Sequence, residues 1–154
     1  MTYFLSGLSL DNGNKMVFNG SYMVFFGEYQ VNLSGSGRFV LPKRIRELIK
    51  GNTFILTKGF DNSLAGYDRE DWEKRAADLL NPSLLQPSDL KERRGIFSAL
   101  SYLEIDEQGR FVIPKNLLGF ADIKDEAVII GVGDHFEIWD SEKWKEYNKK
   151  SKIK

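Results

Sequence analysis

GRFVLPK at residues 37–43 is followed 72 positions later by GRFVIPK at residues 109–115. The same offset matches two acidic residues and one tryptophan of the first stretch to identical residues of the second: Asp68, Glu70 and Trp72 to Asp140, Glu142 and Trp144. A match of this length at one constant offset indicates an internal duplication. Two copies of one unit present two similar surfaces, which suits a repetitive partner better than a single catalytic cleft.

On either side of the repeated block, each copy predicts the same order of elements. A strand at 25–33, rich in aromatic and β-branched residues, leads into a turn at 34–37, where Gly37 supplies the positive φ that a tight hairpin requires. The matching turn at 106–109 ends on Gly109. The strand resumes at Arg38 and stops at Pro42, which cannot donate to a central ladder.

A short amphipathic helix is expected after each proline, followed by a hairpin and a second helix. The hairpins are predicted at 53–57 with 64–67 and at 127–132 with 136–139, and Gly59 and Gly131 are expected to correspond near their turns. Asp68 and Asp140 are typical helix N-caps.

Several apolar residues are expected to face the interior from the helices. In the helices that follow Asp68 and Asp140, and in a further helix at 88–99, they are Trp72, Ala76, Leu79, Leu80, Leu90, Phe97, Trp144 and Tyr147. The two tryptophans are interpreted as core anchors because they occupy matching helix positions.

The pattern predicts an α+β fold. One copy alone would be a marginal domain, and its first hairpin would leave strand edges unpaired. The economical solution is a pseudo-twofold swapped-hairpin β-barrel, built from two tandem repeats that share one core and carry flanking helices. The predicted segments are an N-terminal extension at 1–22, a first repeat at 23–81, a linker and helix start at 82–95, a second repeat at 96–147, and a basic tail at 148–154.

The amino-acid composition excludes several classes of function. The 154 residues include no cysteine, so disulfides, thiolate catalysis and sulfur-ligated metals are excluded. The longest wholly aliphatic stretch, 127–130, is far shorter than the ~20 residues of a membrane-spanning helix. His135 is the only histidine, and neither a serine–base set nor a metal set accompanies it. We therefore expect neither an enzyme nor a cofactor, metal, membrane or small-molecule substrate.

Net charge is zero, but the charges are unevenly placed. The stretch from 38 to 50 holds five basic residues with Glu47 as the only acid: Arg38, Lys43, Arg44, Arg46 and Lys50. In the second copy, Arg110 and Lys115 remain, whereas Asn116 and Leu118 replace two of the arginines. An anionic partner would therefore meet local patches, and the first repeat is expected to supply more of the electrostatic attraction.

Four stretches resemble the MraZ family of bacterial transcription regulators, which have two tandem half-domains similar to the AbrB and MazE swapped-hairpin proteins. They are MVFFGEYQVNL at 23–33, the two GRFV(L/I)PK blocks, TKGFDNSL at 57–64 and VGDHFEIWDSEKW at 132–144. The family signature is an Asp-x-x-x-Arg pair in each half. Asp106 and Arg110 satisfy it in the second half, whereas Ser34 stands where the aspartate before Arg38 is expected.

The resemblance implies a cytoplasmic, nucleoid-associated homo-oligomer, ring-shaped, that binds short direct repeats in double-stranded DNA near cell-division and cell-wall genes. It favours these DNA-binding residues: Arg38, Lys43, Arg44, Arg46, Arg110 and Lys115. The turn positions Ser34, Gly37, Asp106 and Gly109 would shape the two hairpin turns. We call these turns the tips: the first at residues 34–38 and the second at residues 106–110. Arg38 is the preferred candidate for a base contact, because a guanidinium pairs bidentately with guanine.

Other interpretations stay open. Lys43, Arg44 and Arg46 fit the solvated face of an amphipathic helix equally well on pattern alone, and Arg110 next to Asp106 fits a locally paired arginine. A different class of function is a protein-binding swapped-hairpin module of the antidote type, in which a tail wraps a toxin. The lysine-rich end lacks apolar anchors for such a groove, which favours DNA as the partner.

Overall fold

The computed structural model describes residues 8–10, 16–18, 24–34, 37–80 and 86–151. Most of the predicted N-terminal extension therefore lies outside the described residues, as do Pro82, Lys152 and Lys154. Within the extension, β1 (Leu8–Leu10) and β2 (Met16–Phe18) form an antiparallel pair.

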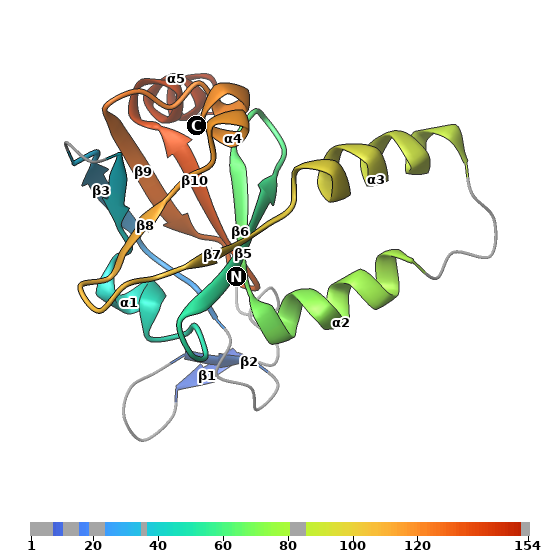
Figure 1. Ribbon diagram of the computed structural model, residues 1–154, viewed down its shortest axis with the longest axis horizontal. Coiled ribbons are helices and arrows are strands. Elements are labelled where there is room, and N and C mark those ends of the chain that lie inside the picture. The colour runs from blue at the N-terminus through green and yellow to red at the C-terminus, as the bar shows by residue number, and fades with distance from the viewer. Residues whose placement is uncertain (1–7, 11–15, 19–23, 35–36, 81–85, 152–154) are drawn as a thin grey trace.

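The elements follow the predicted order in both repeats. The first repeat contains β3 (Glu28–Asn32), β4 (Arg38–Val40), α1 (Lys43–Arg46), β5 (Thr53–Lys58), β6 (Leu64–Asp68) and α2 (Arg69–Leu79). The second contains β7 (Ser101–Glu104), β8 (Arg110–Val112), α4 (Lys115–Ala121), β9 (Glu126–Gly131), β10 (Phe136–Asp140) and α5 (Ser141–Lys150). α3 (Pro87–Ala99) precedes the second repeat, and with α2 it extends away from the strands (Figure 1).

Strands of the two repeats alternate in the sheets. Over the described residues, one sheet has six strands in the order β3-β9-β10-β6-β5-β7, so each repeat lends its first strand to the other repeat's hairpin. β4 and β8 form a separate antiparallel pair, which we call the ribbon. Because pairing crosses between the repeats, the strands of each first hairpin have partner strands. The mixture of helices and strands confirms the expected α+β class.

Both repeats contribute to one hydrophobic core, as expected from their small size. Phe39 and Phe111 pack beneath the ribbon with ring centroids 6.3 Å apart, and Phe54 contacts Phe111 at 5.2 Å. Phe136 continues the cluster, 5.6 Å from Phe54. All four rings are nearly inaccessible to solvent. Deleting one such ring typically costs about 3–5 kcal/mol, so the core fixes the ribbon firmly to the sheet.

The constant offset between the repeats fails in one pair of strands. Phe54 lies opposite Asp68 in the first hairpin, whereas Ala127 lies opposite Asp140 in the second. β9 therefore begins one residue later than the offset requires, and its hairpin turn is one residue shorter. The expected correspondence of Gly59 and Gly131 is wrong for this reason: Gly131 is still paired inside β9.

The two predicted N-cap aspartates differ. The Asp140 side chain accepts a hydrogen bond from the Lys143 backbone N–H at 3.3 Å, as a cap should. Asp68 precedes α2 but makes no such bond; its Oδ1 accepts from the Lys50 backbone N–H at 2.8 Å. Asp68 is fully buried, and its bond to Lys50 ties the turn that follows α1 to the start of α2.

The apolar stripe predicted for α2 is only partly buried. Trp72 is inaccessible, as expected of a core anchor, but Leu79 and Leu80 are 36% and 57% exposed. Phe97 of α3 contacts Trp72 at 5.9 Å and is nevertheless 37% exposed. These helices project beyond the sheet, so their outer turns have no strand to pack against (Figure 1).

Candidate nucleic-acid interface

The ribbon separates aromatic from cationic side chains. Its register places Arg38 opposite Val112, Phe39 opposite Phe111, and Val40 opposite Arg110. Because side chains alternate along a strand, the two phenylalanines point into the core and the other four residues share the outer face. Arg38 and Arg110 are half-buried at their bases. The two arginines predicted for different tips therefore lie on one surface.

The second tip, residues 106–110, is held by a carboxylate. Asp106 Oδ1 accepts hydrogen bonds from the backbone N–H groups of Gln108 and Arg110, at 2.9 and 2.8 Å. Its Oδ2 accepts a third, 2.8 Å from Nε of Arg110. The backbone bond from Arg110 is the chief reason that the pKa of the Asp106 carboxyl lies below its ordinary value of 3.8. The Arg110 side chain is thus fixed through Nε, which leaves both terminal Nη groups for a ligand.

The first tip is closed by the same two backbone hydrogen bonds as the second, but its first residue is a serine. Ser34 N–H donates to the Arg38 carbonyl at 2.8 Å and Gly37 N–H donates to the Ser34 carbonyl at 2.9 Å. Asp106 and Gly109 make the corresponding bonds at 2.9 Å each. φ is 76° at Gly37 and 80° at Gly109, as both turns were predicted to require.

Arg38 differs from Arg110 in its pairing. No carboxylate in the described part of the chain pairs with Arg38, whereas Arg110 is held by Asp106. Residues 35–36 lie outside the described residues.

Arg46 belongs to the first repeat but lies at the second tip. A Cβ atom added to Gly109 would overlap the Arg46 guanidinium, and the Gly109 carbonyl accepts a hydrogen bond from Leu41 N–H at 2.8 Å. The same addition at Gly37 meets nothing within 4 Å. The second tip therefore contains cations from both repeats, because Arg46 of the first repeat adds to the charge around Arg110.

The remaining predicted cations occupy the short helices. Lys43 and Lys115 are exposed at the first positions of α1 and α4, and neither forms an ion pair with a described residue. Arg44 lies over the Phe26 ring, 5.6 Å from its centroid. Arg44 is therefore partly engaged within the chain, whereas both lysines can extend toward a phosphate.

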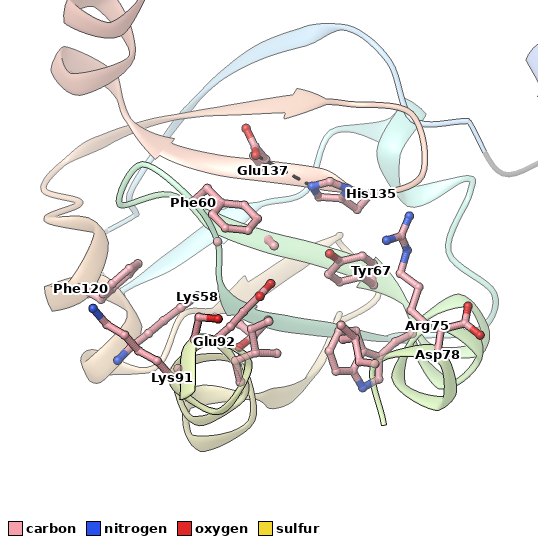
Figure 2. Close-up of a pocket in the computed structure, with 18 residues that line it drawn as sticks. Lys58, Phe60, Tyr67, Arg75, Asp78, Lys91, Glu92, Phe120, His135 and Glu137 are labelled. Carbon is pink, nitrogen blue, oxygen red and sulfur yellow. Dashed lines mark hydrogen bonds and ion pairs between the residues drawn. The ribbon is translucent and has the colours of Figure 1, made fainter. Parts of the chain in front are cut away.

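A groove of about 990 Å³ lies between α2, α3 and the sheet (Figure 2), and none of its lining residues belongs to the ribbon. Its apolar lining includes Phe60, Tyr67, Trp72, Ile96 and Phe120. Figure 2 shows lysines at one end and Arg75 with Asp78 at the other. Phe60 is 72% exposed, the highest value among the large hydrophobic residues that the structure describes.

One wall of the groove joins the two repeats. Arg75 of α2 forms an ion pair with Asp134, and the His135 ring stacks on Tyr67 at 5.0 Å. His135 Nδ1 lies 2.6 Å from the Asp134 carboxylate, and Nε2 lies 3.9 Å from Glu137 (Figure 2). Burial opposes ionisation of Glu137, but the nearby His135 imidazole and a hydrogen bond from Trp139 outweigh it and lower the pKa of this carboxyl.

Sequence reasoning missed this cross-repeat contact, although Asp134, His135 and Glu137 lie close together in the chain. It also missed that Val40 and Val112 share the ribbon's outer face with the arginines; their alternation with phenylalanine was the available signal. Among the described residues, no acidic, histidine or cysteine cluster could hold a metal ion. No described helix is long and apolar enough to cross a membrane.

The chain is similar to known proteins over most of its length. Residues 24–93 and 96–154 each match the family model described as "MraZ protein, putative antitoxin-like". Three similar curated proteins carry the name Transcriptional regulator MraZ. The protein of Finegoldia magna is 40% identical over 79% of this chain and 85% of its own length. The Clostridium tetani protein is 40% identical over 75% and 81%, and the Acetivibrio thermocellus protein 38% over 77% and 82%.

Proposed function

The chain belongs to the MraZ family, and we propose that it is a sequence-specific DNA-binding transcriptional regulator that contacts DNA through the ribbon and its two tips. Its relatives are named as transcriptional regulators, and transcription regulation is the function that this membership supports. The DNA-contacting surface, the assembly and the target genes are proposed in addition.

One observation carries the proposal: Arg38 and Arg110 project from the same face of a two-stranded ribbon. The major groove of B-DNA is about 12 Å wide and admits such a ribbon. A guanidinium there can donate two hydrogen bonds to O6 and N7 of guanine. Arg110 suits this role best, because Asp106 holds Nε and the Nη groups are left for the base. Arg38, the candidate that the sequence favours, stays a predicted base contact on the same face.

The remaining cations would contact the backbone. Lys43 and Lys115 flank the ribbon on α1 and α4, and Arg46 adds charge at the second tip. If these three residues each neutralise one phosphate, the log–log salt dependence of affinity has a slope of roughly −3. Zero net charge makes such local contacts, and not the overall field, the source of attraction.

The proposal includes a closed ring of subunits built on a pseudo-twofold swapped-hairpin barrel. A single modest patch binds weakly, whereas a ring that engages several evenly spaced repeats gains effective concentration. Head-to-tail closure requires an accepting surface on every subunit. The exposed apolar groove beside Phe60 is our candidate for that surface, with a second copy of this chain as its occupant, and zero net charge favours such association.

Family membership also suggests where in the cell the protein acts and on which genes. We place the protein in the cytoplasm at the nucleoid, acting on short direct repeats near cell-division and cell-wall genes. These statements rest on the resemblance of the chain to its family.

Fluorescence anisotropy with wild-type and variant protein tests DNA binding. Arg38→Ala with Arg110→Ala should lower affinity for a selected site at least tenfold, since each bidentate pair is worth about 1–3 kcal/mol. Arg94→Ala on α3 is the matched control, because it removes an exposed arginine far from the ribbon and should leave affinity unchanged. Equal losses in all variants, or no binding at low salt, would contradict the proposal and favour a protein-binding role.

A further inference from the structure

The outer face of the ribbon carries two exposed apolar side chains between its arginines. Val40 and Val112 are 47% and 49% exposed, and each lies directly opposite an arginine of the other strand. The four residues form a diagonal pattern in which like side chains never face each other. The valines come from different repeats, so the duplication places them at equivalent positions.

The geometry relates each valine to its neighbouring arginine. Side chains directly opposite on antiparallel strands are about 4.5–5.5 Å apart at Cβ, and diagonal ones about 7–8 Å. Base pairs along one DNA strand are spaced about 3.4 Å. Arg38 and Arg110, which are diagonal, would thus reach bases roughly two steps apart. Each valine would meet a base one or two steps from the base that an arginine contacts.

Chemistry selects the group that a valine would meet there. In the major groove, the 5-methyl group of thymine is the apolar feature of the base edges. An aliphatic side chain of fixed rotamer, such as valine on a strand, gives a firm contact with that methyl group. A cytosine at the same place would present only hydrogen at C5 and an amino donor that valine cannot satisfy.

We propose that Val40 and Val112 read thymine methyl groups, so that the ribbon recognises thymine within one or two base pairs of the guanines contacted by its arginines. This proposal deepens the proposed DNA binding and rests on it. It assigns specificity to two residues that lack charge and hydrogen-bonding groups. A simpler account holds that valine is present only because it favours strands. The two accounts differ in what happens when the DNA loses a methyl group.

The test removes the methyl groups from DNA first. A duplex selected by the wild-type protein is prepared with each thymine replaced in turn by deoxyuridine, which lacks only the 5-methyl group. Wild-type affinity should fall about fourfold at the contacted positions, as expected for one buried methyl group. For the Val40→Ala, Val112→Ala double variant, the same replacements should have less than a twofold effect.

Matched controls separate the possible failures. Val132→Ala, which shortens a valine that is 41% exposed on another part of the molecule, should keep the full wild-type response to deoxyuridine. A selected site without thymine near its guanines, or wild-type affinity indifferent to every replacement, would overturn the thymine proposal while leaving DNA binding intact. An equal response in the double variant would overturn it too. A wild-type protein without DNA affinity would refute the proposed function itself.

Discussion

At the scale of single residues, the two tips share their closing backbone hydrogen bonds but differ at the residue before the arginine turn, Ser34 in the first and Asp106 in the second. Asp106 fixes its turn and the Arg110 side chain with three hydrogen bonds, while Ser34 occupies the matching position before Arg38. A fixed guanidinium loses less conformational freedom on binding a base. The difference therefore predicts that Arg110 discriminates between bases more strongly than Arg38.

Asp106→Asn should lower the ratio of specific to non-specific affinity about tenfold, the lower half of the range for one bidentate base contact. It should not weaken non-specific binding, because it removes a negative charge from a surface that faces phosphate. Ser34→Asp is the converse variant and should raise the same ratio. Anisotropy titrations on a selected and a scrambled duplex measure both. A proportional fall in both affinities for Asp106→Asn would assign the aspartate a purely structural role.

Acid should loosen the second tip. The pKa of Asp106 is depressed below 3.8 in the folded chain, so its stabilising contribution is present above that value and is lost as pH falls through the folded-state pKa. Carboxyl NMR titration should give a midpoint below 3.8. Arg110→Ala should raise the midpoint only part of the way, since the backbone bonds remain. A wild-type midpoint at or above 3.8 would contradict the described turn.

At the scale of elements, the two hairpin turns share a left-handed glycine but differ in what covers it. Gly37→Ala and Gly109→Ala should each cost about 1–2 kcal/mol of unfolding free energy, because alanine is strained at positive φ. Only Gly109→Ala should also weaken DNA binding, because its methyl group displaces the Arg46 guanidinium. Denaturant unfolding and anisotropy together measure this. Equal DNA affinities for the two variants would remove Arg46 from the interface.

Most elements could be predicted from the sequence because the duplication and the punctuating residues are local signals. Glycine favours tight turns and proline ends strands, so Gly37, Gly109 and Pro42 could be read directly from the sequence. The one-residue shift of β9 could not be predicted, because it is decided by packing against β10 and β3 and leaves the later offset unchanged. The exposure of Leu79 and Leu80 could not be predicted either, because helical periodicity shows which face is apolar but not whether a sheet lies beneath it.

The candidate site was predictable residue by residue but not as a surface. The sequence indicates Arg38 and Arg110 through the repeated block. It does not show that β4 pairs with β8, which depends on long-range pairing between repeats. That pairing places both arginines and both valines on one face and carries Arg46 to the opposite repeat's tip.

At the scale of the whole molecule, the groove beside Phe60 governs assembly in our proposal. Phe60→Ser should shift the wild-type oligomer to smaller species at micromolar concentration, because it removes an aromatic side chain that is 72% exposed in one chain. Tyr102→Ser, which changes an aromatic 52% exposed on β7 outside the groove, is the control. Sedimentation velocity measures the change. A wild-type protein that sediments as a monomer would contradict the ring, whatever its DNA affinity.

Selection of bound fragments from random duplex DNA by the wild-type protein tests the central claim most directly. We predict enrichment of short, evenly phased words, with guanines at the positions that lose their preference when Arg38 and Arg110 are replaced by alanine. Absence of any enriched word at low salt would contradict the claim, as would an enriched word that both alanine variants select unchanged.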